Sequence, residues 1–242
     1  MKVGLCGWTI GMREYFERFP VVEVQQTFYH PPAQRTLLKW REAAPEGFEF
    51  TMKAWQLITH RATSRTYRRF KGTLDETEKA EAGAFQWTDI VRRAWDTTAE
   101  CARVLRASSV LFQCPASFRA VEENFDRMRT FFTRVDRHGF RFLWEPRGPW
   151  PAEDVRPLCG DLDLVHVVDP FVNESVTPEL IYFRLHGITG ARHVYTDDEL
   201  RHLIAMVPHD RESYVMFNEM ARDRDSVRFL GMLRALSSPT AP

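Results

Sequence analysis

The chain has 242 residues with a formal net charge of zero, and 44% of its residues are hydrophobic. This length suits one domain of ordinary size, and the balanced charge argues against a generally cationic nucleic-acid-binding protein. The sequence contains no apolar run of about eighteen residues, so we expect no membrane span. Its four cysteines are scattered without a Cys-x-x-Cys pair, and the apolar run at the N-terminus is too short and glycine-broken for a signal peptide. We therefore expect reduced thiols in a cytoplasmic protein.

Eight short runs with apolar or alternating side chains predict β-strands along the chain. They cover residues 3–8, 21–29, 48–53, 109–114, 141–145, 162–169, 181–187 and 213–218. Several of these runs end at a proline, which has no N–H to donate and cannot sit within a central strand. Apolar residues at helical spacing predict helices around Tyr15 and Phe16, around Leu37, Leu38 and Trp40, from about 88 to 106, around Phe125 and Phe131, after Thr196, and through Val227, Phe229, Leu230, Leu233 and Leu236.

Residues 55–87 are charged and poor in aliphatic side chains, and we expect a long loop or lid there. Within this segment, residues 61–71 carry Arg65, Arg68, Arg69 and Lys71 together with two aromatic residues. This composition resembles a small patch for single-stranded nucleic acid. A solvated loop face is the plainer interpretation, because four acidic residues follow directly.

Eight strand-like runs that alternate with mostly helical stretches indicate a parallel sheet. Eight such units in a chain of this length predict a single α/β domain over residues 1–242, a (β/α)8 barrel of TIM type, regular or distorted. A doubly wound open sheet is the alternative, but its usual glycine-rich first turn is poorly matched by Gly4-x-x-Gly7.

Polar side chains recur at the carboxyl ends of the predicted strands, on the faces that alternation turns inward. In chain order they are Thr27, Lys53, Gln113, Glu145, Asp169, His186 and Asn218. Active sites of TIM barrels lie at this end of the barrel. In the run 141–147, Leu143, Glu145 and Arg147 share one face, whereas Phe142 and Trp144 share the other. A carboxylate at the end of an apolar strand is costly to bury unless it is paired, so it predicts a site.

This set of residues suits two kinds of chemistry. Acid–base catalysis or a divalent metal could use two carboxylates and two histidines, namely Glu145, Asp169, His60 and His186. Their dispersal over the strands provides no local metal motif. An anion such as phosphate or carboxylate could be held by Lys53, Arg147 and Arg184.

Structural roles are open for the same residues. Glu145 could form an ion pair with Arg147 or Arg184 that only closes the top of the barrel. Lys53 could simply extend into solvent from its strand end. The amides of Gln113 and Asn218 could serve only as hydrogen-bond braces for charged neighbours.

Six motifs spread along the chain are specific in combination, at residues 22–29, 50–54, 58–60, 112–115, 144–147 and 184–187. Together they resemble the YecE-like family, domain of unknown function 72, over nearly the whole chain. The resemblance implies a TIM-type barrel and no established reaction, and a distant likeness to sugar isomerases is one of fold only. The residues that match the family pattern are Lys53, His60, Gln113, Glu145, Arg147, Arg184, His186 and Asn218. Gln25 and Glu219 stand where the family commonly has asparagine.

We expect an enzyme, an isomerase or hydrolase, that acts on a small anionic or polyhydroxylated ligand at the carboxyl end of the barrel. Its catalytic residues would be Glu145, His186 and Asp169. Its ligand-binding residues would be Lys53, His60, Gln113, Arg147, Arg184, Asn218 and Tyr29. No metal ligand is assigned, and the cofactor and the oligomeric state stay open. The alternative is binding or processing of single-stranded nucleic acid through the arginine-rich loop 61–71.

Overall fold

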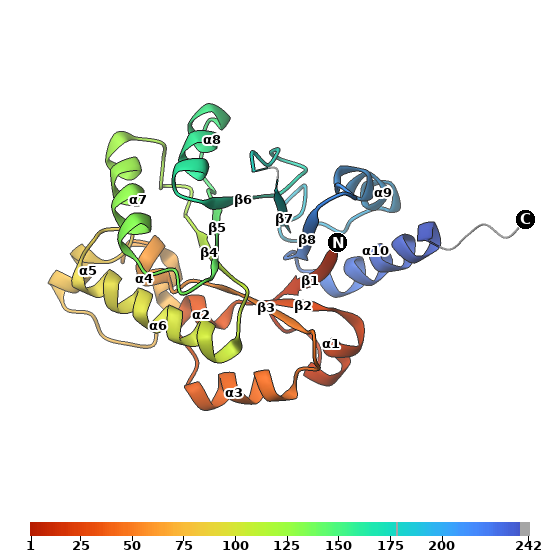
Figure 1. Ribbon diagram of the computed structural model, residues 1–242, viewed down its shortest axis with the longest axis horizontal. Helices are drawn as coiled ribbons and strands as arrows, with labels where there is room; N and C mark the ends of the chain where they lie inside the picture. The colour runs from red at the N-terminus through yellow and green to blue at the C-terminus, as the bar shows by residue number, and fades with distance from the viewer. Residues whose placement is uncertain (178, 238–242) are drawn as a thin grey trace, which may run out of the picture.

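The computed structural model describes residues 1–177 and 179–237. Eight parallel strands, each paired with its neighbours in chain order, close into a barrel where β1 meets β8. They are β1 (Lys2–Cys6), β2 (Val21–Val24), β3 (Glu49–Lys53), β4 (Ser109–Gln113), β5 (Arg141–Glu145), β6 (Leu164–Val168), β7 (Leu180–Leu185) and β8 (Glu212–Phe217). Figure 1 shows these strands at the centre and the longer helices around them. The predicted (β/α)8 barrel of TIM type is confirmed.

The described residues form ten α-helices and one 3-10 helix. They are α1 (Met12–Arg18), α2 (Gln26–Tyr29), α3 (Gln34–Ala43), α4 (Gln56–Thr59), η1 (Arg65–Arg69), α5 (Glu76–Glu81), α6 (Asp89–Leu105), α7 (Glu122–Arg134), α8 (Ala152–Asp161), α9 (Asp197–Met206) and α10 (Arg222–Ser237). Residues 169–177 and 179, between β6 and β7, contain no helix, so the barrel departs here from the regular alternation. No described helix is long and apolar enough to cross a membrane.

Alternation along the strands separates an inner apolar cluster from an outer one. Leu111 and Leu143 lie inside the barrel with other strand residues. Phe112 and Trp144, which follow them in sequence, belong to the larger cluster outside, and Phe112 contacts aromatic rings of α6 and α7. The predicted faces of β4 and β5 are therefore confirmed, and the same alternation turns Gln113 and Glu145, the last residues of these two strands, toward the interior.

Strand β2 is shorter than its alternating pattern predicts. It ends at Val24, and residues 26–29 form the short helix α2. The hydroxyl of Thr27 donates to the carbonyl oxygen of Lys53 at 2.6 Å, which fastens α2 to the end of β3. Thr27 is thus part of a helix and not an inward strand end, because a tertiary hydrogen bond outweighs the period-two pattern.

Three further helical details differ from the sequence pattern. In α10 the buried positions are taken by Asp225, Ser226 and Phe229, whereas Val227 and Leu236 are exposed. In α3, Leu37 is buried but Leu38 is exposed. Helix α8 was not predicted, because it contains Pro157, which removes a helical hydrogen bond and disguises the pattern.

The segment 55–87 is not the single long loop that its composition predicts. It contains α4, η1 and α5, and all four residues of α4 are buried. Gly83 and Phe85 donate backbone hydrogen bonds to Leu57 and Ile58 of α4, at 2.8 and 2.9 Å. The ring of Phe85 is completely buried. Tertiary packing therefore holds both ends of this segment on the barrel.

Gly83 provides a test of that attachment. Its φ is +82°, and an added Cβ would lie 2.2 Å from the carbonyl carbon of His60. Gly139 has a similar φ of +79° but open space around it. We expect Gly139→Ala to lower the free energy of unfolding by about 1 kcal/mol and Gly83→Ala by more than about 3 kcal/mol, measured by urea denaturation. Equal losses in the two variants would contradict this account of the segment.

Candidate functional site

Four charged side chains point into the barrel at the carboxyl ends of its strands. They are Glu23 of β2, Lys53 of β3, Glu145 of β5 and Arg184 of β7, and none of them is more than 6% exposed. Charge at this depth needs compensation, since an uncompensated buried ion costs several kcal/mol. The hydrogen bonds among these groups show where that compensation comes from.

Arg184 binds both carboxylates at once. Its Nε and Nη2 donate to Oε2 and Oε1 of Glu23, at 3.1 and 2.9 Å, in a two-pronged pairing. Its Nη1 donates to Oε2 of Glu145. Two parallel hydrogen bonds from a guanidinium to one carboxylate are among the strongest hydrogen-bond arrangements in proteins. We call Glu23, Arg184 and Glu145 the Arg184 network.

The second oxygen of Glu145 faces two further donors. Oε1 lies 2.7 Å from His186 Nε2 and 3.3 Å from Arg147 Nη1. Burial by itself raises the pKa of Glu145, but the charge of Arg184 and the hydrogen bond from His186 outweigh it. The net result is a pKa well below the usual range, so Glu145 is held ionised.

His186 is fixed on three sides. The amide nitrogen of Asn218 lies 2.9 Å from Nδ1, so Nδ1 accepts and Nε2 carries the hydrogen that Glu145 receives. The main-chain N–H of His186 donates to Asp169 at 2.8 Å. Burial lowers the pKa of His186 more than Glu145 raises it. A neutral imidazole thus sits against an ionised carboxylate, the arrangement of a histidine that is ready to accept a proton.

Lys53 lies in the same interior without a carboxylate of its own. Its Nζ is 3.6 Å from the centroid of the Phe28 ring, and it forms no ion pair with any described residue. Burial, followed by the like charge of Arg184, lowers the pKa of Lys53 from 10.5 to about 7. The expectation that Lys53 could simply extend into solvent is wrong, because the side chain is buried inside the barrel.

The remaining residues of the predicted set lie around this centre. Asp169 accepts main-chain hydrogen bonds from His186 and Phe171, at 2.8 and 3.1 Å, so it positions the backbone beside the imidazole. Gln113 is half-buried and is the register partner of Glu145 on the neighbouring strand.

His60 and Tyr29 lie on the Phe28 side, away from the Arg184 network. The His60 ring packs edge-on to Phe28 at 4.9 Å between centroids. Burial, and then the charge of Lys53, lowers the pKa of His60 to about 3. Tyr29 stacks beneath the Arg69 guanidinium at 3.6 Å. These two residues therefore surround Phe28 and Lys53, and no hydrogen bond or ion pair joins either of them to Glu145 among the described residues.

Sequence reasoning left Glu23 and Tyr182 out of the site. The Tyr182 hydroxyl donates to Glu23 Oε2 at 2.9 Å and lies 2.8 Å from the hydroxyl of Thr51. Glu23 falls at an inward position of β2 that alternation does identify, but its partner lies on β7, far away in sequence. On the neighbouring strand, Cys6 is the register partner of Glu23, and burial raises the pKa of its thiol, so Cys6 remains a thiol beside Arg184.

The described part of the chain contains no group of three or more His, Cys, Asp or Glu side chains placed to hold a metal ion. Glu145 and Asp169 direct their oxygens to Arg184, His186 and main-chain N–H groups instead. Of the predicted carboxylates and histidines, Glu145 and His186 are therefore hydrogen-bonded to each other, and Asp169 accepts from the main chain of His186.

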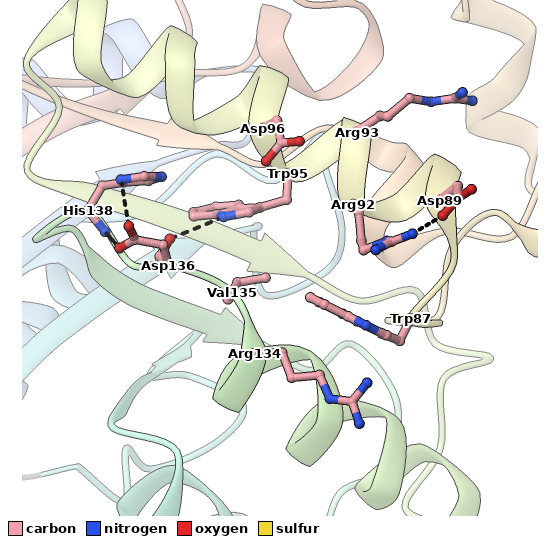
Figure 2. A pocket seen from close by; sticks show the side chains of 10 residues that line it. All are labelled: Trp87, Asp89, Arg92, Arg93, Trp95, Asp96, Arg134, Val135, Asp136 and His138. Atoms are coloured by element: carbon pink, nitrogen blue, oxygen red, sulfur yellow. Dashed lines mark hydrogen bonds and ion pairs between the residues drawn. The ribbon is translucent and has the colours of Figure 1, made fainter.

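A separate groove of about 510 Å³ lies on the outside of the barrel, between α6 and the end of α7. Figure 2 shows its aromatic and charged lining, with Trp87 between Arg92 and Arg134, and Trp95 beside Asp136 and His138. None of the strand-end residues lines this groove. It is thus distinct from the candidate site.

The closed parallel barrel defines a TIM-barrel protein, and its charged, hydrogen-bonded side chains lie at the carboxyl ends of the strands. TIM-barrel enzymes have their active sites at this end. The family described as "Protein of unknown function DUF72" matches residues 7–241. The chain belongs to this family, for which YecE-like is another name, so the resemblance seen in the sequence is confirmed. No curated protein matches the chain.

Solved structures with this fold include family members and enzymes. A DUF72 family protein from Enterococcus faecalis V583 is 21% identical, with a TM-score of 0.73 over 98% of this chain and 97% of that one. A D-psicose 3-epimerase determined in the presence of D-fructose is 12% identical, with a TM-score of 0.63 over 97% and 99%. Endonuclease IV from Thermus thermophilus is 11% identical, with a TM-score of 0.55 over 97% and 98%. At these identities the likeness is one of fold.

The Arg184 network can be tested by removing its cation. We expect Arg184→Met to lower the free energy of unfolding by about 3–5 kcal/mol, because it leaves two buried carboxylates without the cation that they share. The matched change Arg147→Met, at an exposed side chain, is expected to cost less than about 1 kcal/mol. Adding Glu23→Gln to the Arg184→Met variant should recover part of the loss. Similar losses in the two single variants, measured by chemical denaturation, would count against a stabilising network.

Proposed function

We propose that this protein is an enzyme that performs general acid–base chemistry on a small polyhydroxylated ligand with an anionic group, bound at the carboxyl end of the barrel. The observation that carries the proposal is the chain of hydrogen bonds Glu145–His186–Asn218, in which an ionised carboxylate orients a neutral, partly exposed imidazole. Such a pair is suited to proton transfer near neutral pH.

His186 would be the residue that exchanges the proton. Its Nε2–H is directed to Glu145, so Nδ1 is the nitrogen that accepts a proton once a ligand displaces the Asn218 amide. Glu145 would then stabilise the resulting imidazolium and not donate a proton itself, because Arg184 keeps it ionised. Asp169 would hold the main chain of His186 in place.

The ligand class follows from the groups that remain accessible around His186. Arg147 is exposed and would pair with an anionic group, with the ammonium form of Lys53 adding positive charge from within. The half-buried amides of Gln113 and Asn218 are suited to hydroxyl groups. The shared fold with a D-psicose 3-epimerase supports a sugar-like ligand by analogy alone.

Deuterium uptake tests the proton transfer directly. The wild-type protein would be incubated in D2O with a panel of hydroxy-aldehydes, hydroxy-ketones and their phosphates, and exchange at the carbon beside the carbonyl followed by NMR. We expect His186→Gln and Glu145→Gln to slow the exchange by about 10²-fold or more. Because Glu145→Gln also takes one of two buried carboxylates from Arg184, this variant should melt at a lower temperature, and exchange is compared where circular dichroism shows that both proteins are folded.

The control for this experiment is His202→Gln, at an exposed position of α9, which should change neither rate nor stability. Absence of exchange with every compound, or equal rates in the His186→Gln variant, would contradict the proposal. A large loss of stability in Glu145→Gln without a loss of exchange would assign Glu145 to a purely structural ion pair.

A second candidate function, binding of single-stranded nucleic acid, is favoured by one surface observation. A hollow of about 470 Å³ beside η1 is lined by Arg61, Arg127 and several hydroxyl groups, among them Ser64 and Ser117. The charge of Arg61 acts against that of Arg127, and Glu123, which also lines the hollow and pairs with Arg127, offsets part of this repulsion, so an anion would rely mainly on Arg61. Endonuclease IV, which shares the fold, makes this alternative worth testing.

The nucleic-acid alternative predicts a salt dependence. If exposed Arg65 and Arg68 contact phosphates, Arg65→Gln/Arg68→Gln should weaken binding to a fluorescent oligonucleotide and reduce the slope of log K against log salt by roughly 0.7 per contact. Arg69 is left in place because it packs on Tyr29. The matched double change Arg13→Gln/Arg201→Gln, at exposed arginines of α1 and α9, should have no effect. Identical slopes in the two double variants would end this alternative.

A further inference from the structure

Lysine is rare in this chain. Only five of its 33 basic residues are lysines: Lys2, Lys39, Lys53, Lys71 and Lys79. Of these, Lys53 alone is buried, at the carboxyl end of β3. A guanidinium never loses its proton in proteins, whereas an ammonium in a low-dielectric site does so readily. The choice of lysine at this position therefore provides an amine that an arginine could not.

The surroundings of Lys53 favour the neutral amine. Both carboxylates of the interior are already bound by Arg184, so a charged Lys53 would add an uncompensated cation beside a guanidinium. The negative charges of Glu145 and Glu23 oppose the effects of burial and of Arg184 but do not overcome them. On the other side lie the Phe28 ring, whose face gives an ammonium a modest cation–π attraction, and the neutral ring of His60, and neither provides a countercharge.

The amine is also within reach of a ligand. Lys53 retains 6% of its exposure, and its Nζ has no hydrogen-bond partner among the described residues. The completely buried side-chain nitrogens and oxygens without a hydrogen-bond partner do not include Nζ, so this atom is not completely buried. The nitrogen thus keeps contact with solvent at the end of the barrel where His186 lies.

We propose that Lys53 is a nucleophilic amine that forms an imine with the carbonyl carbon of an open-chain hydroxy-aldehyde or hydroxy-ketone. The inference rests on the proposed function for the ligand class and adds a covalent step to it. The nitrogen lone pair attacks the carbonyl carbon, and a proton passes from nitrogen to oxygen to give a carbinolamine. Loss of water then forms the carbon–nitrogen double bond, and no oxidant or reductant is needed.

This step would serve the proton transfer at His186. When the imine nitrogen is protonated, it withdraws electrons from the neighbouring carbon and makes its C–H more acidic than that of the parent carbonyl compound. A base at the same end of the barrel then removes that proton, and hydrolysis returns Lys53 as the free amine. Lys53 and His186 would therefore act in sequence on one ligand.

Reductive trapping tests the inference on the full chain. The protein would be incubated with glycolaldehyde or dihydroxyacetone and sodium cyanoborohydride, digested and mapped by mass spectrometry. We expect an adduct of the compound's mass less one oxygen on Lys53, formed at least about tenfold faster at pH 7 than on exposed Lys39. Labelling of Lys53 should rise from pH 6 to pH 8 and then level off, because its pKa is about 7. Labelling of Lys39 should keep rising at higher pH.

Two variants complete the test. Lys53→Arg retains the cation and should lose both the adduct and the deuterium exchange, whereas Lys39→Arg should retain both. Labelling of Lys53 no faster than of Lys39, or wild-type exchange in Lys53→Arg, would overturn the inference. In that case exchange that still depends on His186 would leave the proposed acid–base function intact. Specific trapping on Lys53 without any deuterium exchange would instead support imine formation at Lys53 and contradict the proposed proton transfer at His186.

Discussion

The pairing of Arg184 with two buried carboxylates is the interaction on which the carboxyl end of this barrel depends. Glu23, Glu145 and Arg184 come from β2, β5 and β7, no two of which are neighbours in the sheet, so the guanidinium bridges the interior. Removal of water from three charges is costly, and only their mutual hydrogen bonds offset it. With one oxygen of Glu145 held by Arg184, the other is left to orient His186.

The same pairing sets the state of Lys53. Because Arg184 binds both carboxylates and adds its own positive charge, Lys53 forms no ion pair among the described residues, and its pKa lies near neutrality. The two basic residues thus differ in role: the Arg184 guanidinium stays charged and holds the carboxylates, whereas the Lys53 amine can gain or lose a proton. The charge of Arg184 therefore influences the protonation states of both Glu145 and Lys53.

The opposite end of the barrel shows how a purely structural cation differs. Lys2 is bound by Glu49, Glu212 and the hydroxyl of Tyr214, and these hydrogen bonds raise its pKa although burial alone would lower it. Lys53 has no such partners in the part of the chain that the structure describes. At the carboxyl end, two further residues join the site. Gln25 donates to Glu23, and Glu219 accepts the main-chain N–H of Asn218 at 3.1 Å.

By itself the sequence determined the eight strands, their inward faces and the polar residues at their ends, because these depend on local alternation and on prolines that stop strands. It placed Lys53, Glu145, Arg184, His186 and Asn218 at one end of a barrel without showing which of them touch. Only the tertiary structure decided that Arg184 reaches Glu23 across the interior, that Lys53 has no carboxylate partner among the described residues, and that Thr27 belongs to a helix. These features depend on contacts between strands that are distant in the chain, and no periodicity along the chain records them.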